Sequence, residues 1–313
     1  MMKKERILSI DILKGIGIIL VMLGHALHHD SFIRILIYTF HMPLFFWCSG
    51  FFYKDKPFKD AIIKDAKSLL IPWLMFSLFL TLCACVLGYK DGQYNLLQFN
   101  VLNENSWCIF YTIWFLVCLF YVKVVYQGIT ALVSNRKILS VTIWGGYFCS
   151  FLLKFYGLNI PLFLDSTMAM LIFYHTGRVF HEKKYNEANI HIGIIITVLI
   201  IYSIMVYWIM PEVNIKDNQF PIYLILMAMI PITALFYLCK RINSRFLIRC
   251  GTASIVIMGL HHPIYDVVMF PLMNRLPLPT YVEPYIMVAL LLPILLFVEK
   301  LIMKLSPWIM GKF

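Results

Sequence analysis

Residues 7–27 of the chain read ILSIDILKGIGIILVMLGHAL, an apolar run that carries three ionisable residues, Asp11, Lys14 and His25. The run has the length of a helix that crosses a bilayer, for which about 20 mainly apolar residues are needed. Ionisable side chains are costly in hydrocarbon, so they usually face a protein interior, a partner charge or a water-filled cavity. This stretch therefore predicts a membrane helix that has a polar, functional face.

The three ionisable residues share one side of the predicted helix. Lys14 and His25 are eleven residues apart, which brings them within about 20° of the same face with a rise of about 16 Å. Asp11 and Lys14 are three residues apart and are neighbours on that face. A neutral histidine bonded to a backbone carbonyl is the ordinary alternative for His25. We favour a functional role because the three groups lie on a common face.

Composition indicates a membrane protein. Of the 313 residues, 61% are hydrophobic and only 14% are charged, whereas soluble domains have about 25% charged residues. The sequence predicts an all-α polytopic membrane helix bundle with about ten transmembrane helices. No repeat or linker divides it, so we expect one domain over residues 1–313. The predicted spans are 7–27, 35–53, 69–88, 112–132, 138–156, 160–180, 190–210, 220–239, 251–271 and 284–304.

The net charge of +11 is explained by topology. With an inner N-terminus, 20 of the 27 basic residues fall in inner segments and five in outer segments. An excess of Lys and Arg on the cytoplasmic side is the usual signature of orientation, so both termini are predicted to be cytoplasmic. We accordingly expect a multi-pass protein of the cell membrane, in contact with membrane lipid, and no nucleic-acid partner.

A second segment with polar residues follows at 40–50 and reads FHMPLFFWCSG. The first span runs outward and the second runs inward, which places His25 and His41 in the outer half of the membrane and Lys14 in the inner half. The sequence therefore permits the two histidines to meet. Histidine titrates near neutral pH and is the most frequent general base.

Two questions stay open from the residues alone. His261 and His262, in the ninth predicted span, either line the same cavity as His25 or satisfy carbonyls at the kink of Pro263. Lys123, within an apolar span, either pairs with a carboxylate or extends to the lipid head groups. The cysteines show no spacing typical of a metal site, so no metal is expected.

The chain resembles the membrane-bound acyltransferase 3 family, near its fucose 4-O-acetylase-like branch. The resemblance rests on the pattern Lys14-x10-His25 and on Phe45-Phe46-x-x-Ser49-Gly50, with Lys64-x-x-Lys67 as a weaker match. Lysines stand where arginines are commoner in the first and third patterns, so the charge is kept but the planar fork for bidentate phosphate binding is lost.

The resemblance implies an O-acyltransferase that moves an acetyl or similar group from cytosolic acetyl-CoA, the co-substrate, to a sugar hydroxyl. The acceptor would be a surface glycan or its lipid-linked precursor. The basic inner rim suits the phosphates of acetyl-CoA, for which Lys64, Lys67 and Arg178 are the candidates.

The remaining candidates have catalytic roles. We expect His25 to take the proton of the sugar hydroxyl, near His41, and Lys14 and Asp11 to form a charge pair that orients the first helix. Ser49 is the candidate donor to the oxyanion. A transient acetyl-histidine that carries the group across the membrane is the alternative chemistry.

A proton-coupled transporter or a glycan flippase is the rival from another class, because intramembrane His, Lys and Asp also suit a proton relay. Transporters often contain internal repeats with paired broken helices. Residues 160–313 contain no second copy of the first two motifs, which favours the enzyme.

Overall fold

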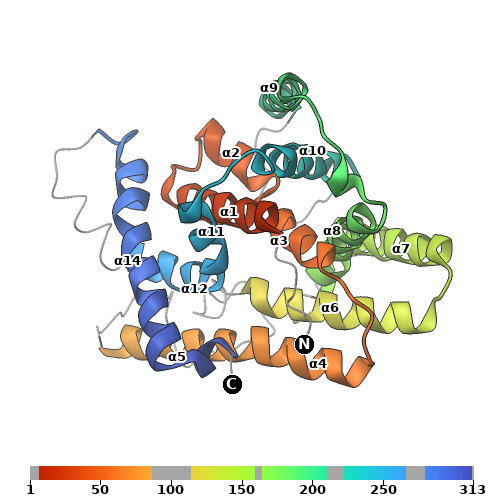
Figure 1. Cartoon of the computed structure of the whole chain (residues 1–313), viewed down its shortest axis with the longest axis horizontal. Coiled ribbons are helices and arrows are strands. Elements are labelled where there is room, and N and C mark those ends of the chain that lie inside the picture. The colour runs from red at the N-terminus through yellow and green to blue at the C-terminus, as the bar shows by residue number, and fades with distance from the viewer. Residues whose placement is uncertain (1–6, 87–113, 159–163, 210–221, 266–278, 312–313) are drawn as a thin grey trace. The chain divides into compact units, whose positions relative to one another are not determined.

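The computed structural model describes residues 7–86, 114–158, 164–209, 222–265 and 279–311, and every regular element in these ranges is helical (Figure 1). The α-helices are α1 (Leu8–Ala26), α2 (Phe32–Tyr38), α3 (His41–Phe51), α4 (Phe58–Asp65), α5 (Ile71–Val86), α6 (Trp114–Leu132), α7 (Arg136–Phe155), α8 (Leu164–Glu182), α9 (Ile192–Ile209), α10 (Ile222–Cys239), α11 (Arg245–Thr252), α12 (Ser254–Ile264) and α14 (Glu283–Leu305). A π-helical turn, η1 (Ala66–Leu70), joins α4 to α5, and a 3₁₀ turn, η6 (Pro307–Met310), follows α14.

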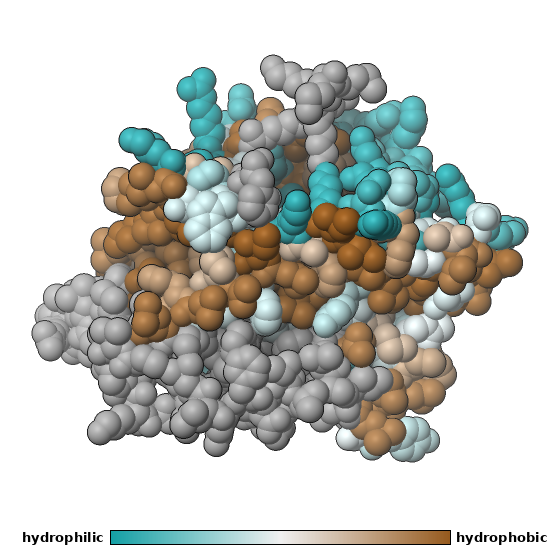
Figure 2. All heavy atoms as spheres, turned by 90° about the horizontal axis from the view of Figure 1, so that it is seen from below, coloured by the Kyte–Doolittle hydropathy of each residue, from teal (hydrophilic) through white to brown (hydrophobic). Residues whose placement is uncertain are grey.

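Several of these helices have the length and apolar character of membrane spans. Four segments of the described chain are long and apolar enough to cross a bilayer: α1, residues 32–51, α6 and α14. Helices α9 and α10 are shorter apolar helices. Large hydrophobic side chains are exposed on them, and Figure 2 shows a broad hydrophobic area on the face that it draws. The protein is therefore a helical membrane protein, while the number of ten spans and the cytoplasmic termini stay predictions.

Two predicted spans are interrupted. The span predicted over 35–53 consists of α2 and α3, with a break at Thr39 and Phe40. Pro43 accounts for this break, because a proline ring inside a helix clashes with the carbonyl four residues earlier, which here belongs to Thr39. The span predicted over 251–271 begins inside α11, breaks at Ala253 and continues as α12. Residues 266–271 of that span, and residues 89–111 between the third and fourth predicted spans, lie outside the described residues.

The chain forms two compact units, each built from separate parts of the sequence. Unit 1 comprises residues 1–52 and 176–296, and unit 2 comprises residues 53–175 and 297–313. In unit 1, α1 is the common neighbour of α2, α3, α10, α11 and α12. In unit 2, α4 and η1 pack on α6, and the turn η6 packs on η1 and α5.

Glycines allow α1 and α11 to touch backbone to backbone. A Cβ at Gly15 would lie 2.1 Å from the carbonyl oxygen of Leu247, and one at Gly251 would lie 1.9 Å from that of Asp11. Small residues permit such close crossings of membrane helices. The helix that carries the candidate site residues is thereby held against α11.

Candidate active site

His25 lies in a cluster of imidazole and phenol rings near the C-terminal end of α1. Its ring centroid is 5.2 Å from that of His261 and 5.1 Å from that of His262, and the Tyr38 ring is 6.1 Å away. The His25 side chain is exposed, whereas His261 is buried. Unit 1 thus places one accessible imidazole against two others that come from α12.

His261 contacts both His25 and the backbone of its own helix. Its ring contacts His25, and its Nδ1 lies 2.9 Å from the carbonyl oxygen of Ile257 and 3.0 Å from that of Met258. Carbonyl oxygens only accept hydrogen bonds, so Nδ1 carries the proton and donates it. In the neutral ring the basic nitrogen of His261 is therefore Nε2.

His41 is fixed in a similar way at the beginning of α3. It is buried, and its Nδ1 donates to the carbonyl oxygen of Ile37 at 3.0 Å. The Tyr38 ring lies 4.8 Å from His41 and also contacts His25. Tyr38 therefore links the two histidines that the sequence permits to meet.

Lys14 and Asp11 lie about three and four turns before His25 on α1 and are half-buried. The Lys14 Nζ is 5.3 Å from the centroid of the Phe52 ring, a cation–π contact. Both residues lie near Cys48, because burial and the Asp11 carboxylate raise the electrostatic cost of a thiolate there and the Lys14 ammonium lowers it. The Lys14 ammonium thus lies over an aromatic face, and the charge pair between Lys14 and Asp11 stays a prediction.

Ser49 is not brought to the histidine cluster. It lies in the last turn of α3, eight residues after His41, which corresponds to about 12 Å along the helix. An oxyanion donor must be within hydrogen-bond reach of the reacting carbonyl. A carbonyl that reacts beside His25 and His41 is thus far from the Ser49 hydroxyl.

The candidate lysines for phosphate binding belong to unit 2. Lys64, on α4, and Lys67, on η1, are both exposed. Partial burial and the neighbouring Lys64 ammonium lower the pKa of Lys56, which shows that Lys56 and Lys64 lie close together. Lys123 forms an ion pair with Asp65, which answers the open question about that lysine in favour of a carboxylate partner.

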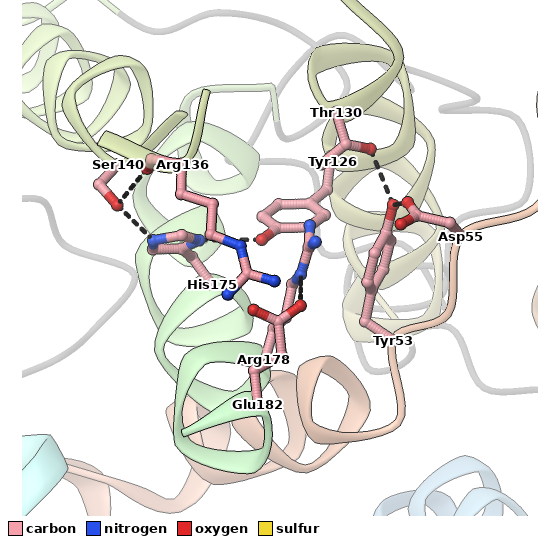
Figure 3. A network of polar contacts seen from close by, with 9 residues as sticks. All are labelled: Tyr53, Asp55, Tyr126, Thr130, Arg136, Ser140, His175, Arg178 and Glu182. Carbon is pink, nitrogen blue, oxygen red and sulfur yellow. Dashed lines mark hydrogen bonds and ion pairs between the residues drawn. The ribbon is translucent and has the colours of Figure 1, made fainter. Parts of the chain in front are cut away.

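Arg178 belongs to unit 1 and already has a carboxylate partner. Its Nε donates to Oε1 of Glu182 at 2.7 Å, one turn later on α8. A phosphate at Arg178 would therefore share the guanidinium with Glu182. Figure 3 shows this pair.

Unit 2 also contains a hydrogen-bonded histidine that the sequence did not single out as a site (Figure 3). The Tyr126 hydroxyl is 2.8 Å from Nδ1 of His175, and Nε2 is 3.0 Å from the Ser140 hydroxyl. Ser140 in turn donates to the carbonyl oxygen of Arg136 at 3.0 Å. Because the serine has one hydroxyl proton, Nε2–H donates to Ser140 and Tyr126 donates to Nδ1. Tyr126 and Ser140 lie in helices where no sequence pattern marks them.

The fold and these contacts define a helical membrane protein with a histidine cluster on its first helix. A family model described as an acyltransferase domain matches residues 7–298. The chain therefore belongs to the acyltransferase 3 family and is a membrane acyltransferase, which confirms the family inferred from its motifs. Its place near the fucose 4-O-acetylase-like branch stays a prediction. No curated protein and no solved structure was found to match it. The family match gives no support to the transporter alternative.

Proposed function

We propose that the protein is an O-acyltransferase that moves an acetyl or similar acyl group from cytosolic acyl-CoA to a sugar hydroxyl. The acceptor is a surface glycan or its lipid-linked precursor. The observation that carries the proposal is the exposed imidazole of His25 against His261 and His262 in unit 1. The match to an acyltransferase domain supports the reaction class.

In this mechanism His25 takes the proton from the sugar hydroxyl as its oxygen attacks the thioester carbonyl. The new C–O bond forms, the C–S bond breaks, and CoA leaves as a thiolate that accepts a proton. An imidazole is suited to this work because its pKa is near the operating pH. The ring of His261, with its proton fixed on Nδ1, offers a basic Nε2 beside the base.

The donor is proposed to bind through its phosphates to lysines of unit 2. Lys64 and Lys67 are exposed, and Lys56 lies beside Lys64. Like charges held close together repel each other, and a bound polyphosphate would relieve that repulsion. Ammonium groups bind phosphate as point charges, so the lysines need no bidentate geometry.

The central test is the substitution His25→Gln, which keeps a polar side chain but removes the base. Inverted membrane vesicles are supplied with radiolabelled acetyl-CoA, and label in glycan or lipid-linked sugar is measured. General base catalysis contributes about 10²–10⁴-fold, so transfer is expected to fall at least about 100-fold.

His28→Gln is the matched control, because His28 is exposed in the loop after α1. It is expected to keep normal transfer. Near-normal transfer in His25→Gln, with equal amounts of protein in the membrane, would remove His25 from the mechanism.

A further inference from the structure

Arg34 is a basic residue of unit 1 that the proposed mechanism does not use. It lies half-buried in α2, and its Nε donates to the carbonyl oxygen of Gly24 at 3.2 Å. Its guanidinium carbon lies 4.3 Å from the centroid of the Tyr38 ring. A hydrogen bond at one edge and an aromatic face below hold the guanidinium in one orientation.

In the described part of the chain, no carboxylate forms an ion pair with this cation. The Nε of Arg34 donates to Gly24, and its guanidinium also interacts with the neutral Tyr38 hydroxyl. The N–H groups on the two Nη atoms form the planar fork that matches a carboxylate or a phosphate. A partly buried cation is costly without a partner, so an anion from outside the protein is favoured at this position.

The fork lies close to the proposed base. The Tyr38 ring contacts both groups. Its centroid lies 4.3 Å from the guanidinium carbon of Arg34 and 6.1 Å from the centroid of the His25 ring. The two distances together put the guanidinium no more than about 10 Å from the imidazole. One or two sugar rings bridge such a distance.

Gly24 makes this arrangement possible. A Cβ at Gly24 would lie 3.0 Å from the Tyr38 ring and 3.2 Å from Ile37, so any larger residue would press on α2. The same residue offers its carbonyl oxygen to Arg34 and precedes His25 in the chain. The position of the guanidinium is thereby tied to the position of the base.

We propose that Arg34 is an acceptor-binding residue that holds a carboxylate or phosphate oxyanion of the sugar while a hydroxyl of that sugar reaches His25. The acceptor is accordingly an acidic sugar or a sugar phosphate. The role as an acceptor site rests on the proposed function, whereas the binding of the anion does not.

The experiment compares three soluble probes, methyl β-D-glucuronide, glucose 1-phosphate and methyl β-D-glucoside. Their dissociation constants are measured by calorimetry on the full-length protein in phosphatidylcholine nanodiscs. At least one anion is expected to bind about 10-fold more tightly than the neutral glucoside, as a charge-assisted pair predicts. Preference for the glucuronide or for the phosphate tells which oxyanion the site takes.

Arg34→Gln is expected to bring the anions to the affinity of the glucoside. Arg34→Lys keeps the charge without the fork and is expected to keep part of the preference for anions. This second variant keeps the test valid if Arg34→Gln does not fold. Arg245→Gln removes an exposed arginine of α11 and is expected to behave as the wild type.

The proposal is overturned if the wild type shows no preference for either anion, in which case Arg34 serves as a head-group anchor. It is equally overturned if the preference survives in Arg34→Gln. Acetyl transfer is measured on the same samples. Anion binding at Arg34 without any transfer would contradict the proposed function and leave the binding site in place.

Discussion

The backbone fixes the protons of two buried histidines, His41 and His261. His41 and His261 each donate Nδ1–H to a backbone carbonyl, which leaves Nε2 as the basic nitrogen. The sequence predicts that these histidines lie within membrane-spanning segments. It cannot assign their tautomers, because the carbonyls that fix them are chosen by the local helix geometry.

The pair of Lys123 and Asp65 shows the same limit. The sequence reduces the options for Lys123 to a carboxylate partner or the head groups. The choice depends on the packing of α4 against α6, which brings together residues far apart in the chain. Neither hydropathy nor residue spacing predicts that contact between helices.

His175 provides a stability prediction at this scale. Tyr126→Phe removes the hydroxyl that donates to Nδ1 of His175 and leaves a buried acceptor without its donor. An unsatisfied buried polar group costs about 1–3 kcal/mol, so the free energy of unfolding is expected to fall by that amount. Thermal or denaturant unfolding in detergent measures the change.

Tyr121→Phe is the control, because Tyr121 lies on the same helix, is half-buried and forms a ring contact with Phe120 but no hydrogen bond within the described residues. Its stability is expected to match the wild type. An equal loss in the two variants would show that the Tyr126 hydroxyl contributes nothing specific.

Among the elements, the contact between α1 and α11 has the most direct consequence. The carbonyl oxygen of Leu247 leaves no room for a Cβ at Gly15. Gly15→Ala is expected to lower the free energy of unfolding by about 1–3 kcal/mol, the usual cost of overpacking, and to reduce acyl transfer as α1 shifts. Thermal unfolding and the vesicle assay measure the two effects.

Gly145→Ala on α7 is the matched control, since a Cβ there meets no atom within 4 Å. Alanine is the better helix former, so this variant is expected to gain about 0.5–1 kcal/mol or stay unchanged. Opposite signs for the two substitutions would establish the close crossing, and equal signs would argue against it.

Element boundaries were partly readable from the sequence. Helix α1 begins and ends within a residue of its prediction. The break between α2 and α3 has a signal, Pro43, whose ring excludes the carbonyl of Thr39 from the helix. The break at Ala253 between α11 and α12 has no comparable signal, because no proline lies four residues later.

For the whole molecule, composition and two motifs were sufficient for the class. Low charge, long apolar runs and the pattern Lys14-x10-His25 predicted a helical membrane acyltransferase, and the family match confirms that class. The side chains proposed to recognise the substrates could not be read from a motif, because Arg34 and Tyr38 come beside His25 through the packing of α2 on α1. Contacts of this kind depend on tertiary packing rather than on a local sequence pattern.

The proposed binding of acetyl-CoA is tested on the intact protein in membranes. Lys67→Ala is expected to raise the acetyl-CoA concentration that gives half-maximal transfer by about 3- to 10-fold, because one contact to a charged group is lost. The maximal rate is expected to change little. Transfer is measured over a range of acetyl-CoA concentrations in inverted vesicles.

Lys137→Ala removes another exposed lysine of unit 2, on α7, and is expected to leave the acetyl-CoA requirement unchanged. An unchanged requirement in Lys67→Ala would assign Lys67 to the lipid head groups. A rise in both variants would indicate a general effect of surface charge.

The histidine cluster joins residue 25 to residues 261 and 262, so its parts are synthesised more than 200 residues apart. A ribosome completes most of the polypeptide before the imidazoles of α12 exist. Premature stop codons between α1 and α12 therefore yield products that contain the first helix but lack the histidine cluster.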